Sequence, residues 1–362
     1  MKKSMFKLTN LFLLVLIVSF VSCNKKSDTI PAPEEEIVEE EEEVIEEEEE
    51  EEEETGGETF ASVVEQHGQL SISGNKIIDK NGEAVQLRGM SFFWSQWMGQ
   101  YYTKEVVKWL KDDWQATVVR AAMAVDEADG YIFNPEVEKA KVIEVVDAAI
   151  AEGIYVIIDW HSHHAEDYLD EAKAFFSEMA QKYGDYPNVI YEPYNEPLEV
   201  SWTGVLKPYH EAVIESIREH DPDNIVICGT RTWSQRVDQV VGNEIDDDNV
   251  AYTLHYYAAT HKQSLRDIAD IALDADVPLF VTEYGVSEAS GDGSIDEDEA
   301  NKWWNYLDDN KISWCNWSIA DKVELSAALN PGASALGNWS ASDITQSGNM
   351  VRNELKAMNP DY

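Results

Sequence analysis

Residues 154–161 read Ile-Tyr-Val-Ile-Ile-Asp-Trp-His, an apolar and largely β-branched run that ends in polar and aromatic residues. A short apolar run of this kind is typical of a strand that is buried on both faces of a parallel sheet. Similar runs recur along the chain, and their starts are 26 to 37 residues apart. This spacing is close to the ~30 residues of one strand, one helix and two loops. The runs cover 85–92, 117–124, 154–160, 188–194, 224–230, 250–256, 278–284 and 312–318.

The stretches between these runs have the helical period, most clearly over 103–114, 135–152, 168–183, 205–220 and 296–309. Strand-then-helix units in this number predict a (β/α)8 TIM barrel of the α/β class, for which about 250 residues in one domain are ordinary. A doubly wound open sheet would favour a Gly-rich phosphate loop after its first strand, and residues 89–94, Gly-Met-Ser-Phe-Phe-Trp, form no such motif. Residues 70–87, with Asn81-Gly82 as the turn, predict an N-terminal β-hairpin before the barrel.

The C-terminal ends of the predicted strands carry the residues with chemistry. In a (β/α)8 barrel the catalytic groups project from those ends, so these residues test the assignment. Polar, titratable and aromatic side chains gather there, which predicts one active site at that end of the barrel. They are Arg120, Asp159-Trp160-His161, Asn195-Glu196-Pro197, His255-Tyr256-Tyr257, Glu283, Trp314 and Trp317.

Two glutamates, Glu196 and Glu283, close the fourth and the seventh of these apolar runs. Either one alone would be interpreted as a solvent-facing rim residue, but the pair suits the hydrolysis of a glycosidic bond. That reaction needs one carboxyl group that protonates the leaving oxygen and one that attacks or supports the anomeric carbon. Desolvation and mutual repulsion would raise the pKa of one of them, leaving a protonated acid and an ionised nucleophile at neutral pH.

Segments in this order resemble those of glycoside hydrolase family 5, and within it the bacterial endo-1,4-glucanases. Asn-Glu-Pro alone is a weak signal, whereas seven motifs in the family's order and spacing are a strong one. The resemblance covers about residues 65–355, nearly the whole predicted barrel. The matching segments are 85–91, 119–123, 157–161, 189–197, 254–258, 281–285 and 313–318.

The resemblance implies a retaining mechanism with Glu196 as general acid/base and Glu283 as nucleophile, their carboxyl groups about 5–5.5 Å apart. It also implies that Asn195 holds the 2-hydroxyl of the sugar in the −1 subsite. For each implied tryptophan platform, core packing remains the alternative. The resemblance further implies that Arg120 and Tyr257 position and ionise Glu283, and that His161 and His255 form hydrogen bonds with sugar hydroxyls or with Glu196. It implies that Trp317 lies beneath the −1 sugar and that Trp97 and Trp233 serve neighbouring subsites. Lys322 and Glu324 are implied as a sugar-binding pair.

Two features depart from that family's pattern. Phe93-Trp94 stand where some relatives place a His after the first strand, so one hydrogen bond to the −1 sugar is absent or is replaced by stacking. Residues 161–166, His-Ser-His-His-Ala-Glu, resemble a metal cluster. However, adjacent His163 and His164 cannot easily both face one ion, and His161 has a role at the strand end. We therefore expect neither a metal ion nor a cofactor.

The N-terminus predicts export. Three lysines precede the apolar stretch 8–22, which is shorter than the ~20 apolar residues of a membrane-spanning helix. Residues 1–22 are therefore predicted to be a signal peptide. Cys23 follows directly, as the lipid-bearing Cys follows a bacterial lipobox, so we expect lipidation at Cys23. This predicts an outer-membrane or cell-surface lipoprotein, with a plain secreted protein as the alternative.

A Glu-rich segment follows at 23–57 and precedes the predicted catalytic domain at 58–362. It holds 17 glutamates between Glu34 and Glu54. Like charges at this density repel one another and cannot bury apolar area, so the segment is predicted to be an extended, disordered linker.

Composition limits the partners. The chain has 71 Asp plus Glu against 27 Lys plus Arg and a formal net charge of −44, which excludes a nucleic-acid binder built on a basic face. Twelve Trp, 16 Tyr and 10 Phe favour an aromatic-lined cleft for a neutral ligand. Cys228 and Cys315 lie in apolar runs that are not adjacent in barrel order, so we expect two buried free thiols. We also expect a monomer whose contact with a membrane is confined to the lipid anchor.

Together these residues predict a retaining endo-β-1,4-glucanase that acts on cellulose and related β-glucans. A β-mannanase or xyloglucanase on the same barrel is the first alternative, and only the lining of the subsites would separate it. The second is a non-catalytic glycan-binding surface lipoprotein, which would be marked by a missing carboxylate. Both Glu196 and Glu283 are present.

Overall fold

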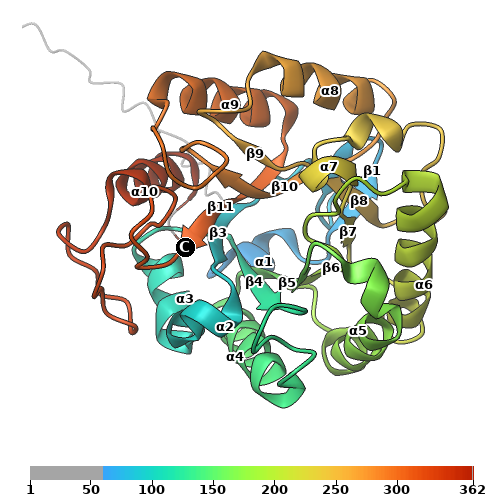
Figure 1. Cartoon of the computed structure of the whole chain (residues 1–362), viewed down its shortest axis with the longest axis horizontal. Coiled ribbons are helices and arrows are strands. Elements are labelled where there is room, and N and C mark those ends of the chain that lie inside the picture. Colours follow the sequence, from blue (N-terminus) through green and yellow to red (C-terminus); the bar gives the residue numbers. More distant parts are fainter. Residues whose placement is uncertain (1–59, 361) are drawn as a thin grey trace, which may run out of the picture. The chain divides into compact units, whose positions relative to one another are not determined.

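Parallel strands close into a barrel in the computed structural model, which describes residues 60–360 and 362. The hydrogen-bonded order is β11-β3-β4-β5-β6-β7-β8-β10-β9, and pairing between β10 and β11 closes the ring. Helices surround these strands on all sides (Figure 1). The (β/α)8 barrel predicted from the sequence is confirmed.

The strands follow the predicted runs with shorter ends. They are β3 (Arg88–Phe92), β4 (Val118–Ala124), β5 (Tyr155–His161), β6 (Val189–Glu192), β7 (Val226–Cys228), β8 (Val250–Thr253), β9 (Tyr256–Tyr257), β10 (Leu279–Gly285) and β11 (Ser313–Ile319). The helices are α1 (Val63–His67), α2 (Ser95–Met98), α3 (Lys104–Asp112), α4 (Pro135–Glu152), α5 (Leu169–Tyr183), α6 (Lys207–Arg218), α7 (Arg231–Ser234), α8 (Gln263–Leu273), α9 (Glu297–Asn310) and α10 (Gln346–Met358). Shorter helical turns are η1 (Gly99–Tyr101), η2 (Ala165–Tyr168), η3 (Trp202–Leu206) and η4 (Val237–Gln239).

Local sequence explains why the helices begin and end where they do. The side chain of Thr103 accepts a hydrogen bond from the backbone of Val106 and caps α3, and Thr345 caps α10 in the same way. Pro135 occupies the first turn of α4, where its missing N–H is not needed. That helix ends at Gly153, whose left-handed φ of 69° suits a residue without Cβ.

Three details of the predicted strand-and-helix repeats are wrong. The fourth barrel strand, β6, ends at Glu192 because Pro193 has no N–H to donate to the ladder. The sixth barrel strand is split into β8 and β9, since the backbone N–H of His255 donates to Ser234 O at 2.8 Å instead of to a neighbouring strand. The fifth repeat has no full helix, because only the short α7 and η4 lie between β7 and β8.

The N-terminal segment turns at Asn81-Gly82, as predicted, and also at Gly74. Strands β1 (Ser71–Ser73) and β2 (Lys76–Ile78) pair antiparallel around Gly74, whose φ is +57°. Asn81-Gly82 form a second turn, in which the Asp79 carboxylate accepts from the backbone N–H of Asn81 at 2.8 Å. Ile78 and Ala84 form an antiparallel bridge across Asn81-Gly82, so the predicted hairpin turn is confirmed and Gly74 adds another.

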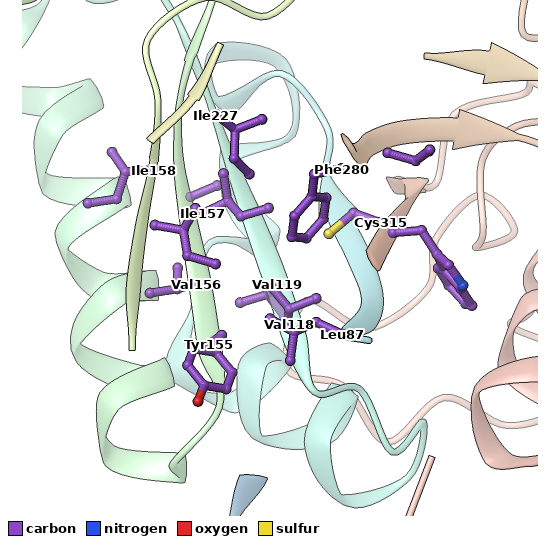
Figure 2. Close-up of a cluster of buried hydrophobic side chains, with 14 of the residues drawn as sticks. Leu87, Val118, Val119, Tyr155, Val156, Ile157, Ile158, Ile227, Phe280 and Cys315 are labelled. Atoms are coloured by element: carbon purple, nitrogen blue, oxygen red, sulfur yellow. The ribbon is translucent and has the colours of Figure 1, made fainter. Parts of the chain in front are cut away.

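Apolar side chains fill the lower part of the barrel, toward the N-terminal ends of the strands. Figure 2 shows this packing, with Ile157 of β5, Ile227 of β7, Phe280 of β10 and Cys315 of β11 drawn together. Cys228 and Cys315 are both buried free thiols, as predicted. The apolar layer is a floor on which the polar groups above it rest.

Some predictions concern the first 59 residues and lie outside the described part of the chain. They are the signal peptide, the lipidation of Cys23 and the Glu-rich linker. The described residues belong to one compact unit, Gly57–Tyr362. Within the described part of the chain, no helix has the length and apolar character needed to cross a membrane.

Candidate active site

Two buried carboxyl groups face each other above the apolar floor. Glu196 follows β6, and Glu283 lies on β10 on another side of the ring. One carboxylate oxygen of each, together with a ring nitrogen of His255, falls within a set of atoms no more than 4.8 Å apart. The Glu283 side chain is 6 % exposed and the Glu196 side chain 14 %. The pair is therefore close and largely desolvated.

A bulge in β10 brings Glu283 into this position. The register of β10 against β11 shifts between Val281 and Tyr284. The Thr282 hydroxyl and the neighbouring Glu283 carboxylate both bond groups of the barrel interior, Glu192 and Arg120, which a regular strand with alternating side chains would not allow.

Arg120 of β4 is the cation at the centre of the site, and it is completely buried. Its Nε donates to Glu192 at 2.7 Å, its Nη2 lies 2.9 Å from Asp159 and its Nη1 donates to Glu283 at 3.3 Å. The same Nη2 donates to Asn195 Oδ1 at 2.7 Å. One guanidinium thus holds three carboxylates and the residue before Glu196 in a fixed arrangement.

The contacts of Glu283 favour its ionised form. The Tyr257 hydroxyl donates to Glu283 Oε1 at 2.7 Å, and Arg120 donates to Oε2. A carboxylate that accepts hydrogen bonds from a phenol and a guanidinium is stabilised relative to the acid. Glu283 is therefore the member of the pair that keeps its charge.

The contact of Glu196 with His255 favours its protonated form. The Thr282 hydroxyl donates its one hydrogen to the Glu192 carboxylate at 2.7 Å. The Thr282 oxygen can therefore only accept from His255 Nε2, which lies 2.9 Å away and must carry a hydrogen. The neutral imidazole then has an unprotonated Nδ1, and this atom lies 2.9 Å from Glu196 Oε1. A carboxylic acid at Glu196 can donate to that nitrogen, whereas a carboxylate cannot.

The pKa values agree with this distribution of protons. Burial raises the pKa of Glu196 to about 7. Burial and the charge of Glu196 raise the pKa of Glu283 to about 7 as well. Burial lowers the pKa of His255 to about 4, so its ring is neutral at neutral pH. Since the two glutamates take up protons in the same range, their different partners decide that the first proton goes to Glu196.

The carboxyl pair lies between two cavities. One, of about 330 Å³, has aromatic walls and contains Lys322 and Glu324. Its ring Trp317 stacks on His161 with centroids 5.0 Å apart and planes 5° apart. The cavity is lined by Phe93, Trp94, Trp97, His161, His163, Asn195, Glu196, Tyr257, Glu283, Ala289, Ser290, Gly291, Trp317, Lys322 and Glu324.

The second cavity, of about 420 Å³, shares Glu196, Tyr257 and Glu283 with the first. Its distinctive residues are Trp233 and Gln235 in the loop after β7. Together the cavities form a groove that passes over the two glutamates.

An unusual backbone conformation holds Trp233 in the second cavity. Thr232, Trp233 and Ser234 have φ of 61°, 53° and 56°, the left-handed region that costs ~1–3 kcal/mol per non-glycine residue. The loop is fastened to the segment around Glu196, since the backbone N–H of Trp233 donates to Pro197 O at 2.8 Å. The Ser234 hydroxyl donates to Asn195 O at 2.8 Å. The strained loop thus ties one wall of the groove to the residues at its centre.

Residues 78–323 match the family model described as Cellulase (glycosyl hydrolase family 5). The chain belongs to glycosyl hydrolase family 5. It is 51 % identical over 300 residues to Endoglucanase A of Evansella cellulosilytica, a match that covers 82 % of this chain and 61 % of that protein. The chain therefore spans less than two thirds of the length of this relative.

Solved structures give the same result. A structure from Cytophaga hutchinsonii is 56 % identical with a TM-score of 0.81, covering 82 % of this chain and 97 % of that one. The catalytic domain of Thermobifida fusca endoglucanase Cel5A, solved as a variant in complex with cellotetraose, is 36 % identical with a TM-score of 0.78 and covers 81 % of this chain and 99 % of that one.

In this family 5 barrel, the residues expected at the site lie around the groove. Trp97 and Trp233 are 53 % and 44 % exposed, so neither belongs to the core. Trp317 is 5 % exposed yet lines the first cavity, so its ring is both packed and accessible from one side. Those that line the two cavities are Glu196, Glu283, His161, Asn195, His255, Tyr257, Trp317, Trp97, Trp233, Lys322 and Glu324, with Arg120 beneath them.

The His-rich segment 161–166 does not gather around one point. His161 Nδ1 bonds Asp159 at 2.6 Å, His163 Nδ1 approaches Glu196 O at 3.2 Å, and Glu166 accepts from Tyr194. Among the described residues, the one set of His, Cys, Asp and Glu with the spacing of metal ligands is Glu196, His255 and Glu283.

Sequence reasoning missed three residues of the network. The Glu192 carboxylate accepts a hydrogen bond from Arg120, and the Thr282 hydroxyl accepts one from His255. His163 lies beside Glu196. Glu192 and Thr282 carried a usable signal, since each is a polar residue inside an apolar strand. His163 carried a misleading one, because its neighbours made it look like a metal ligand.

Proposed function

We propose that this protein is a retaining endo-β-1,4-glucanase that cleaves internal bonds of cellulose and related β-glucans. The observation that carries the proposal is the separation of Glu196 and Glu283, whose oxygens lie within 4.8 Å. Retaining glycosidases have carboxyl groups about 5–5.5 Å apart, whereas inverting ones are about 6.5–9.5 Å apart because they need room for a water molecule. The relative from Evansella cellulosilytica is named an endoglucanase, and the Thermobifida fusca structure holds cellotetraose, a β-glucan fragment.

In the first step, the Glu283 carboxylate attacks the anomeric carbon of the sugar in the −1 subsite. The bond from that carbon to the glycosidic oxygen breaks, and the Glu196 carboxylic acid gives its proton to this oxygen. The result is a glycosyl ester on Glu283, an ionised Glu196 and a released chain end with a free hydroxyl.

In the second step, water enters where the released chain was bound. Glu196 takes a proton from the water molecule while the water oxygen attacks the anomeric carbon. The ester bond between that carbon and Glu283 then breaks. Two displacements on the same carbon restore its original configuration. Both glutamates return to their starting protonation states.

The surrounding residues prepare this reaction. Arg120 and Tyr257 hold Glu283 in its ionised form and aim it. Asn195 accepts from Arg120 through its oxygen, so its amide nitrogen remains as the donor for the 2-hydroxyl of the sugar. Trp317 offers an apolar face to the C–H face of the −1 sugar. Glu196, Glu283 and these partners need no cofactor.

The groove favours a neutral polymer. Trp97 on one flank and Trp233 on the other provide exposed aromatic surface for further glucose units, and Lys322 pairs with Glu324 beside the first. The excess of acidic residues disfavours nucleic acids and polyuronates, which carry a negative charge on every unit. We propose a monomer that binds β-glucan and reaches a membrane through lipidated Cys23, after export by residues 1–22 to the outer membrane or cell surface.

The first experiment is reducing-sugar release by the full chain from carboxymethylcellulose, barley β-glucan, xyloglucan, glucomannan and galactomannan. We expect strong activity on the glucans that is lost in Glu196→Gln and Glu283→Gln. Activity confined to the mannans would make the protein a β-mannanase, and activity confined to xyloglucan would make it a xyloglucanase, both on the same barrel. Silence on all five, with binding retained, would instead make the protein a glycan-binding lipoprotein.

A further inference from the structure

His163 lies beside Glu196 and has no part in the mechanism above. It follows β5, and its Nδ1 is 3.2 Å from the backbone oxygen of Glu196 and 3.6 Å from Oε2 of the same residue. His255 contacts the other carboxyl oxygen, Oε1, at 2.9 Å. Each oxygen of Glu196 therefore faces a different imidazole.

The position of His163 is fixed by bonds between its loop and the segment that carries Glu196. The backbone N–H of Glu196 donates to Ser162 O at 3.3 Å, and the Tyr194 hydroxyl lies 2.9 Å from His163 O. The Trp94 ring packs on the imidazole with centroids 5.9 Å apart. The His163 side chain is about one-third exposed at the wall of the first cavity, so it is held in place without being sealed from the groove.

The hydrogen on the His163 ring can be assigned from its partner. A backbone carbonyl only accepts, so Nδ1 carries the hydrogen and donates to Glu196 O. The same N–H faces Oε2, at a distance that catalytic hydrogen bonds often show before substrate binds. His163 thus offers Glu196 a donor, which favours the carboxylate, whereas His255 offers an acceptor, which favours the acid.

We propose that His163 is a positioning residue that orients Glu196 toward the leaving oxygen and limits how far into the alkaline range Glu196 keeps its proton. This proposal rests on the proposed role of Glu196 as acid/base. Other charged or titratable groups also face Glu196, and they are unchanged by substitutions at His163. They are Arg120 from β4, Asp159 from β5, Glu192 from β6, His255 from the segment between β8 and β9, Tyr257 from β9 and Glu283 from β10.

The test compares three variants that differ in the donor they keep. In His163→Asn the amide nitrogen lies where Nδ1 was, whereas His163→Ala has no donor and His163→Gln has its donor farther from the backbone. Exposed His164→Ala is the neighbouring control. The measurements are the pH profiles of kcat/KM for cellotetraose and for 2,4-dinitrophenyl β-cellobioside, whose leaving group needs no proton.

Loss of the donor removes an interaction with ionised Glu196, so the alkaline limb for cellotetraose should move up by roughly 0.5 pH unit in His163→Ala and His163→Gln. At pH 7, kcat/KM for cellotetraose should fall about 10-fold in these variants, and that for the activated substrate about 2-fold at most. His163→Asn and His164→Ala should resemble the wild type.

An unmoved alkaline limb, or equal losses on both substrates, would overturn the proposal, and the Gln variant decides the matter if the Ala variant does not fold. Failure of the proposed function has a separate signature. In that case Glu196→Gln would hydrolyse cellotetraose as fast as the wild type, whatever the His163 variants do.

Discussion

The barrel interior has two layers that are built from the same strands but do different work. In the lower layer, Ile157 of β5 and Ile190 of β6 are buried apolar side chains. Two residues later on the same face of the same strands stand Asp159 and Glu192, which are just as buried and bind Arg120. Residues only two positions apart on one strand therefore belong to an apolar core and to a cluster of charged groups.

The difference teaches how stability and activity are divided. Apolar side chains in the lower layer stabilise the fold in proportion to the area they bury. The upper layer holds several acids around Arg120, and burial of such charges opposes folding unless they are paired. We infer that burial in the lower layer offsets the cost of burying charges in the upper layer. Substitutions in the lower layer should therefore reduce mainly stability, and those in the upper layer mainly activity.

The largest effect is expected for Glu283→Gln in the upper layer. Turnover of carboxymethylcellulose should fall by at least ~10⁴-fold because the nucleophile is lost, while binding of cello-oligosaccharides stays measurable. Steady-state kinetics and calorimetric titration check the two parts. Exposed Glu297→Gln on α9 is the matched control and should behave as wild type. Wild-type-like turnover of the Glu283 variant would remove this residue from the reaction.

Arg120→Met should come next, and it should damage both properties. It leaves Asp159, Glu192 and Glu283 without their shared cation, and breaking a buried ion pair costs about 3–5 kcal/mol. Activity should fall on the order of 10³-fold because Glu283 is no longer held as a carboxylate. Urea unfolding and kcat/KM give the two numbers.

The control for Arg120→Met is Arg352→Met, which removes a half-buried pair with Asp113. Such an outer pair contributes roughly 0–1 kcal/mol and should leave activity intact. Equal losses of stability in the two Arg variants would show that the buried ion pairs of Arg120 contribute no more to folding than the outer pair of Arg352.

The pH profile should show a bell centred near pH 7, since burial raises the pKa of both Glu196 and Glu283 to about 7. Below the bell, Glu283 is protonated and cannot attack; above it, Glu196 is ionised and has no proton to give. The value of kcat/KM should therefore fall about 10-fold per pH unit on either side. A profile that stays flat to pH 9 would contradict the assigned protonation states.

Stability should depend on the same groups with a definite sign. An acid whose pKa is raised in the folded state binds more protons there than in the unfolded chain, so it destabilises the fold as pH rises from its ordinary 4.5 toward 7. Glu196→Gln removes this effect, so its Tm relative to wild type should increase between pH 5 and pH 8. A constant difference in Tm would show that burial of Glu196 is not opposed to folding.

The smallest effect on activity is expected in the lower layer, for Ile157→Val. Loss of one methylene from a buried side chain should lower the free energy of unfolding by about 0.5–1.5 kcal/mol. The value of kcat/KM below the unfolding transition should change less than about 2-fold, because Ile157 lines neither cavity of the groove. A tenfold loss of activity would mean that the two layers are mechanically coupled.

Much of this arrangement was predictable from the sequence. The apolar runs gave the barrel, and the residues at their ends gave Arg120, Glu196 and Glu283. The split of the sixth strand at His255 and the bulge beside Thr282 were not predictable, since both come from hydrogen bonds to other segments. The separated positions of His161 and His163 also depend on what each finds nearby, Asp159 for one and Glu196 for the other.

By itself the sequence determined the repeating strand and helix units, the family and the pair of glutamates, because hydrophobic period and motif spacing are local properties of the chain. The assignment of the proton to Glu196 came from the family resemblance, and only the tertiary structure supplies a physical reason for that choice. That choice follows from whether a carboxyl group meets donors, as Glu283 meets Arg120 and Tyr257, or an acceptor, as Glu196 meets His255. Those partners come from different strands, and closure of the barrel brings them within hydrogen-bonding distance.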